Sequence, residues 1–83
     1  MTIELYDSVA LTHPLIAPHE DGEGTVHLAE GARGAVVMVY GNHAAYEVEF
    51  MEGEYTIALL TLTPQDVRLA EKHHPVDISA AAD

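Results

Sequence analysis

The chain has 83 residues and no cysteine, and fourteen acidic residues against three basic ones give it a formal net charge of −11. This length fits one small domain, and the lack of cysteine excludes disulfide bonds and thiolate metal sites. Nucleic acids and anionic membranes attract proteins through cations that contact phosphate, so the shortage of cations disfavours both as partners. The acidic charge could serve solubility alone, or it could steer a basic protein partner toward this surface.

The first predicted strand lies near the N-terminus and places four apolar residues of one parity where they could line a core: Ile3, Leu5, Val9 and Leu11. The opening residues lack the basic start and apolar stretch of a signal peptide, and no apolar run approaches the about 20 residues that span a bilayer. We therefore expect a cytoplasmic protein. A long loop that carries acids and histidines is expected between Leu11 and Gly31.

The middle of the chain predicts a three-stranded antiparallel meander over residues 34–40, 45–50 and 55–62. Residues 45–50 alternate apolar and charged side chains, which is the period of a half-buried strand. A turn centred on Glu52 and Gly53 would fix the register, because a slip by one residue sets glutamates against the core. Between the second and third strands the expected pairs are Phe50–Tyr55, Val48–Ile57 and Tyr46–Leu59. Between the first and second strands they are Tyr40–Ala45, Val39–Tyr46, Val37–Val48 and Ala35–Phe50.

The last predicted elements are a single helical turn and a short strand over residues 67–70. Thr63 would cap the turn and Pro64 would occupy its first position, where a missing N–H costs nothing. The side chain of Asp66 could reach back to Thr63 in the manner of a capping box. This segment is therefore expected to carry the chain from the meander into its final strand.

Strand periodicity is lost at the C-terminal end, so we predict one domain over residues 1–71 and a flexible tail over residues 72–83. A strand, a long loop, a meander, a single turn and a last strand together describe an all-β fold. The prediction is a small SH3-like barrel of about five strands with one short 3-10 turn. Closure of the barrel hides strand edges, which suits a small monomer.

Four stretches give the chain a resemblance to a known family: residues 5–11, 31–37, 45–50 and 58–62. They resemble a bacterial family of small stand-alone SH3-like barrel domains of unknown function. The resemblance implies the barrel fold. Because some members are encoded beside small toxin-like or uncharacterised genes, it also implies an antitoxin-like or accessory binding role. The chain departs from the family pattern in its longer, histidine-bearing loop.

A second similarity is to the barrel of the non-catalytic beta subunit of nitrile hydratase, carried by His13, Pro14 and residues 31–34 and 46–50. In that family the barrel packs against a metal-bearing partner and supplies no metal ligand, which implies an accessory role. Residues 31–37 also resemble the strand-entry motif of ribosomal and transcription-factor barrels. Those barrels are basic, so a nucleic-acid-binding barrel is an alternative that the charge of this chain disfavours.

The long loop offers a candidate metal site, because imidazole and carboxylate groups can hold zinc or another divalent ion. The candidate ligands are His13, His19 and His27, with Glu20, Asp21 and Glu23 between them. Their spacing matches no closed metal motif, and ordering a flexible loop costs entropy, so a solvated polar loop is the alternative. This set supports a second functional hypothesis, a metal-handling or metalloenzyme accessory protein.

The second face of the predicted sheet is the candidate partner surface. The predicted register turns six apolar residues away from the core side, with Glu47 and Glu49 among them: Val36, Met38, Tyr40, Ala58, Leu60 and Leu62. Some of these side chains could instead turn inward in a tightly bent barrel. If they stay outside, they form an apolar patch rimmed by acids, which is typical of a partner surface or a homodimer seam. We place the partner-binding site at Val36, Met38, Tyr40, Glu47, Glu49 and Leu60.

No residue pattern in the sequence indicates catalysis. The chain has no spacing typical of a serine–histidine–aspartate triad, no phosphate-binding loop and no cysteine nucleophile. We therefore expect no enzyme and no cofactor. The leading hypothesis is a non-enzymatic protein-binding module, antitoxin-like or an accessory subunit to a neighbouring gene product, with a basic protein as its partner and a homodimer as the alternative.

Overall fold

The computed structural model describes residues 2–74, which form seven β-strands and no helix. The strands are β1 (Ser8–Leu11), β2 (Leu15–Pro18), β3 (Thr25–Leu28), β4 (Arg33–Tyr40), β5 (Ala45–Glu52), β6 (Tyr55–Leu62) and β7 (Val67–Glu71). Five of them form one antiparallel sheet in the order β6-β5-β4-β1-β7, and β2 pairs with β3 in a separate hairpin. Within this described part, no helix is available that could cross a membrane. The predicted all-β class is confirmed.

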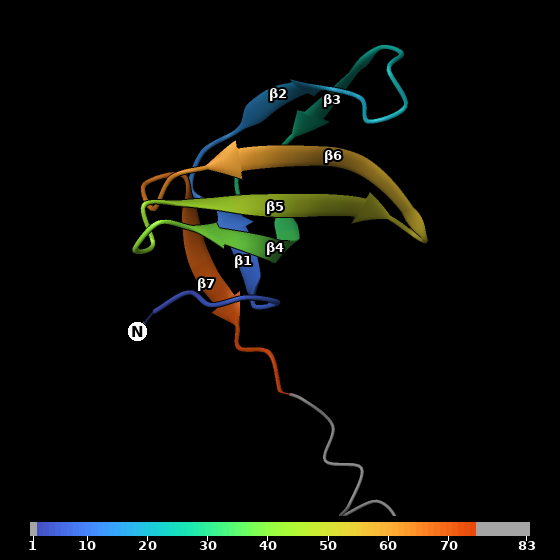
Figure 1. Ribbon diagram of the computed structural model, residues 1–83. Coiled ribbons are helices and arrows are strands. Elements are labelled where there is room, and N and C mark those ends of the chain that lie inside the picture. Colours follow the sequence, from blue (N-terminus) through green and yellow to red (C-terminus); the bar gives the residue numbers. More distant parts are fainter. Residues whose placement is uncertain (1, 75–83) are drawn as a thin grey trace, which may run out of the picture.

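The β2–β3 hairpin closes the large sheet into a barrel-like shape. The sheet is bent, and the hairpin lies beside its edge strand β6 (Figure 1). In the hairpin loop, the N–H of Glu20 donates to the carbonyl oxygen of Ile57 at 2.9 Å. The N–H of Thr12 donates to the carbonyl oxygen of Asp66 at 2.9 Å, which ties the start of the hairpin to the turn before β7. The result is a small all-β domain with a single core.

The segment expected as a long loop therefore contains two strands. Sequence periodicity misses them because each strand has four residues and buries few side chains. Ala17 of β2 and Leu28 of β3 belong to the core, and Leu15 and Val26 pack against it. Burial of these apolar side chains is what orders the hairpin against the sheet.

The core is centred on β5, where the alternation predicted from the sequence is confirmed. Tyr46, Val48 and Phe50 point inward and are at most 3% exposed. Val9 and Leu11 of β1 complete the centre of the core and are fully buried. Burial of side chains of this size contributes about 1.5–3 kcal/mol each, so these five residues of β1 and β5 contribute strongly to the stability of the barrel.

The pairing of β4 with β5 begins as predicted and then shifts at a β-bulge. Tyr40 pairs with Ala45 and Val39 with Tyr46, which confirms two predicted pairs. A bulge at Val37 then sets Val36 opposite Val48. The predicted pairs Val37–Val48 and Ala35–Phe50 are therefore wrong, because a bulge inserts one extra residue into one strand and exchanges the two faces beyond it.

The predicted register between β5 and β6 is also wrong. The turn is centred on Gly53 and Glu54, with Glu52 opposite Tyr55, and a second bulge follows between Phe50 and Met51. Gly53 takes a positive φ of 62°, which favours glycine at the first central position of a tight hairpin. The pairs found in place of the predicted ones are Phe50–Ala58, Val48–Leu60 and Tyr46–Leu62.

This register reverses the predicted faces of β6. Ala58 and Leu62 are buried, whereas they were expected on the second face of the sheet. Leu60 is partly buried and packs against the core. Leu59, which was expected to face Tyr46 in the core, is 39% exposed on the outer side.

The N-terminal strand is shorter than predicted. The backbone turns at Tyr6, which takes a positive φ of 69°, and β1 starts only at Ser8. Ile3 is buried as expected, but Leu5 is 42% exposed. The prediction that Leu5 lines the core is therefore wrong, because the turn breaks the alternation on which it rested.

A single hydrogen-bonded turn forms before β7 at the predicted position. The N–H of Asp66 donates to the carbonyl oxygen of Thr63 at 2.9 Å, which closes a single turn. Oδ2 of Asp66 accepts hydrogen bonds from the N–H of Thr63 at 2.9 Å and from its hydroxyl at 3.0 Å. The predicted reach-back of Asp66 is confirmed.

The residues after β7 are held by the buried carboxylate of Asp7, which is 1% exposed. Nζ of Lys72 donates to Oδ2 of Asp7 at 2.7 Å, and the N–H of His73 donates to Oδ1 at 2.7 Å. Lys72 and His73, which the prediction assigns to the tail, thus contact the turn before β1. Residues 75–83 of the predicted tail lie outside the described residues.

Candidate functional site

Four large apolar side chains lie on the outer side of strands β4, β5 and β6. Met38 is 49% exposed, Tyr40 43%, Met51 49% and Leu59 39%. The alternation of β5 places Glu47, Glu49 and Met51 on the side opposite the core. We call these six outward residues of the three strands the acidic–apolar face: Met38, Tyr40, Glu47, Glu49, Met51 and Leu59.

The register places the two carboxylates in the middle of this face. Glu47 lies opposite Met38 of β4, and Glu49 lies opposite Leu59 of β6. Neighbouring strands are about 4.8 Å apart, so each carboxylate stands beside an apolar side chain. The face therefore offers apolar contact and negative charge together.

Hydroxyl groups hold both carboxylates in place. The hydroxyl of Thr61 donates to Oε1 of Glu47 at 2.6 Å, and the hydroxyl of Tyr40 donates to the same oxygen at 3.2 Å. The hydroxyl of Thr56 donates to Oε2 of Glu49 at 2.5 Å. Desolvation raises the pKa of Tyr40, and the nearby Glu47 charge and hydrogen bond raise it further, so Tyr40 stays protonated as a donor.

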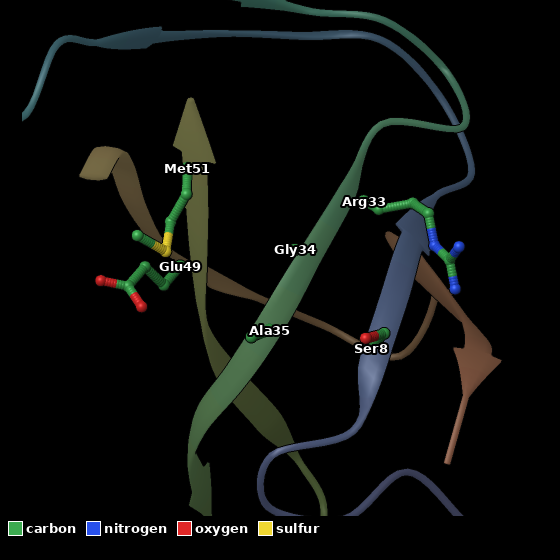
Figure 2. Close-up of a pocket in the computed structure, with 6 residues that line it drawn as sticks. All are labelled: Ser8, Arg33, Gly34, Ala35, Glu49 and Met51. Carbon is green, nitrogen blue, oxygen red and sulfur yellow. The ribbon is translucent and has the colours of Figure 1, made fainter. Parts of the chain in front are cut away.

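A shallow pocket of about 200 Å³ adjoins the acidic–apolar face. Its lining combines small residues with one cation, one anion and a thioether: Ser8, Arg33, Gly34, Ala35, Glu49 and Met51. Figure 2 shows Glu49 and Met51 on one side of the β4 ribbon and Arg33 and Ser8 on the other. A partner side chain could rest on the small residues of β4 between groups of opposite charge.

The structure brings together four of the six residues predicted to bind a partner. Met38, Tyr40, Glu47 and Glu49 share the outer face. Val36 is fully buried and belongs to the core, so the prediction that it lies on the second face is wrong. The cause is the bulge at Val37, which turns the side chain of Val36 inward.

Leu60 is also placed differently from the prediction, because it packs against the core. In its place the face gains Leu59 and Met51, which the sequence analysis missed. Met51 shares the parity of Glu47 and Glu49, so its outward position was readable from the sequence. The outward position of Leu59 depends on the bulge in the β5–β6 pairing, for which the sequence carries no clear signal.

The three histidines proposed as metal ligands lie at separate places, and two of them take part in separate local contacts. Nε2 of His13 lies 2.8 Å from Oδ1 of Asp66, and Nδ1 of His19 lies 3.0 Å from Oδ1 of Asp21. His27 is exposed on β3 opposite Ile16. Among residues 2–74, no three histidine or carboxylate side chains are grouped closely enough to hold a metal ion.

His13 instead joins the hairpin to the turn before β7. Its hydrogen bond with Asp66 is the main cause of a raised His13 pKa, and a bond with the carbonyl oxygen of Pro14 contributes. The pKa of Asp66 is lowered, first by the Thr63 N–H and then by His13. This contact stabilises the closure of the barrel.

One family model, described as a domain of unknown function (DUF4926), matches residues 5–69 of the chain. No curated protein and no solved structure gives a match. The match confirms the predicted membership of a family of unknown function, while the similarities to SH3-like barrels and to nitrile hydratase stay predictions. Since the matched residues span most of the chain, this protein belongs to the family of the domain of unknown function DUF4926.

Proposed function

We propose that this protein is a non-enzymatic protein-binding module that docks a basic protein partner on its acidic–apolar face. Its role would be that of an antitoxin-like protein or an accessory subunit to the product of a neighbouring gene, in the cytoplasm. The observation that carries the proposal is the cluster of four exposed apolar side chains around two carboxylates that are held by hydroxyl groups. The bent sheet and its closing hairpin support the SH3-like barrel predicted from the sequence.

The composition of the face supports a protein partner. Methionine and tyrosine are enriched at protein interfaces, where they supply adaptable contact area and a hydrogen-bonding group. Met38, Tyr40 and Met51 provide that chemistry on neighbouring strands. Because Glu47 and Glu49 are already fixed by hydroxyl donors, binding requires less side-chain ordering.

The charge of the chain supports a basic partner over a second copy of the chain. A two-fold dimer through this face would bring the same surface of each subunit together, and with it Glu47 and Glu49 of both copies. Each copy also carries a net charge of −11. The negative charge of the chain attracts a cationic partner, which then meets fixed carboxylates at the centre of the face.

The proposal is tested with the product of a neighbouring gene, by measuring its association rate with this protein by surface plasmon resonance. The E47K/E49K variant reverses both charges of the face. The E20K/E23K variant is the matched control, because it makes the same change in net charge in the exposed hairpin loop. We expect association with E47K/E49K to be about tenfold slower or more, and slower than with the control, because charge at a docking surface steers encounter.

Thermal unfolding of both variants shows whether the fold is retained, and we expect a smaller effect on stability than on association. Equal association rates for the two variants would contradict the proposed surface. Failure of every neighbouring gene product to bind the folded wild-type protein would contradict the accessory and antitoxin-like roles.

A further inference from the structure

A second hollow on the surface lies on strands β1, β4 and β7, and it shares only β4 with the acidic–apolar face. It has a volume of about 280 Å³ and is lined by Ala10, Gly31, Arg33, Arg68 and Ala70. These lining residues include both arginines of the chain, whose only other cationic side chain is Lys72. Two of three cations thus meet at one hollow in a chain with fourteen acids.

The strand register explains how the arginines reach the same hollow. Ala10 of β1 pairs with Arg33 of β4 on one side and with Arg68 of β7 on the other. Paired residues on neighbouring strands point to the same face of the sheet. With strands about 4.8 Å apart, two long cationic side chains flank one methyl group, and the alanine leaves room between them.

The charges around the hollow leave it cationic. Within the part of the chain that the structure describes, no acidic residue lines it. Arg33 lies 3.6 Å from Glu71, but both side chains are more than half exposed, and such pairs are weak. Within residues 2–74 no carboxylate forms an ion pair with Arg68. Two guanidinium groups on one face repel each other, and an anion bound between them would offset that repulsion.

We infer that the hollow between Arg33 and Arg68 binds an oxyanion, the carboxylate or phosphate group of a ligand. The planar guanidinium group presents paired N–H donors that match two oxygens of such an anion. The small residues Ala10, Gly31 and Ala70 admit the anion without a steric obstacle. This site shares Arg33 with the shallow pocket beside the acidic–apolar face, but its ligand chemistry and two of its three strands differ from those of the face.

The test uses the two arginine side-chain Nε–Hε signals in a nitrogen–proton NMR spectrum of the full chain. Inorganic phosphate and, separately, sodium acetate are titrated at constant ionic strength with sodium chloride. We expect both arginine signals and the amide signals of Gly31 and Ala70 to shift in a saturable way. Binding of acetate alone identifies a carboxylate ligand group, binding of phosphate alone identifies a phosphorylated one, and binding of both identifies a site that accepts either group.

Three variants separate specific binding from the effect of net charge. R68Q and R33Q each remove one cation from the hollow. The N42D variant is the control, because it lowers the net charge by the same amount in the exposed turn between β4 and β5. We expect R68Q and R33Q to weaken phosphate binding about tenfold, which corresponds to about 1.4 kcal/mol, and N42D to leave it nearly unchanged.

The inference is overturned if the shifts rise linearly with anion concentration without saturation. It is also overturned if R68Q and N42D bind phosphate equally well. Shifts that are spread over the whole surface and are not concentrated at the hollow would also overturn the inference.

Discussion

Asp7 forms hydrogen bonds that join the two ends of the described chain. Its carboxylate accepts hydrogen bonds from the N–H of Glu4 at 2.8 Å, from Nζ of Lys72 and from the N–H of His73. Burial raises the pKa of Asp7, but the bonds from Lys72, His73 and Glu4 outweigh it and lower the pKa to about 2. One buried carboxylate thereby joins the turn before β1 to the segment after β7.

The Asp7→Asn variant tests this role. The folded-state pKa lies below the unfolded value of 3.8, so the stabilisation is fully present above pH 3.8 and is lost as the pH falls toward 2. The shift corresponds to about 2 kcal/mol. We expect D7N to lower the free energy of unfolding by about 2–4 kcal/mol at neutral pH, because an amide cannot accept all three bonds and sets a donor near Lys72.

Urea unfolding at several pH values measures the effect. The control is E52Q, which neutralises an exposed acid at the end of β5. The loss in D7N relative to wild type should shrink between pH 3.8 and pH 2, as the wild-type carboxylate becomes protonated. A D7N variant as stable as E52Q at neutral pH would show that Asp7 does not have this role.

At the residue scale, local contacts could be predicted from the sequence and distant ones could not. The bond between Asp66 and Thr63 joins residues three positions apart, and the capping pattern predicts it. The bonds of Asp7 with Lys72 and His73 join residues 65 and 66 positions apart, and no spacing rule connects them. The contact between His13 and Asp66 was missed for the same reason.

At the scale of elements, two β-bulges separate the predicted sheet from the observed one. The strands of the meander and the buried parity of β5 followed from the alternation of apolar and charged residues. The bulge at Val37 and the bulge next to Met51 exchanged the faces of parts of β4 and β6. Bulges depend on how the sheet bends to close around its core, which is a property of the folded chain and leaves no local pattern.

Gly34 allows strand β4 to lie close against residues of β5. A Cβ atom on Gly34 would lie 2.6 Å from Cγ1 of Val48 and 2.9 Å from the carbonyl oxygen of Glu49. Contacts this short force a side chain or the backbone of β5 to move. Gly34 pairs with Val9 of β1, so the strain would also reach the centre of the core.

We expect Gly34→Ala to lower the free energy of unfolding by about 1–3 kcal/mol, which chemical unfolding measures. In the G34A/V48A double variant the closest clashing atom is gone. The combined loss should then be smaller than the sum of the two single losses by about 1 kcal/mol. A G34A variant as stable as wild type would mean that β4 and β5 lie further apart than described.

At the scale of the whole molecule, the chain combines an acidic surface with one mixed apolar face and one cationic hollow. The sequence predicted the all-β class and four of the residues on the outer face. It did not predict the β2–β3 hairpin that closes the barrel, because short strands with few buried residues have weak periodicity. The row of Arg33, Ala10 and Arg68 was also missed, because it needs the register of three strands that are distant in sequence.

The methionine methyl groups report whether a partner binds the acidic–apolar face. The chain has three methionines, and two of them, Met38 and Met51, lie on this face. The methyl signals of isotope-labelled protein are assigned with the M38L and M51L variants and followed by NMR while the neighbouring gene product is added. We predict that the signals of Met38 and Met51 shift or broaden as the complex forms. A complex that forms while both signals stay unchanged would contradict the account.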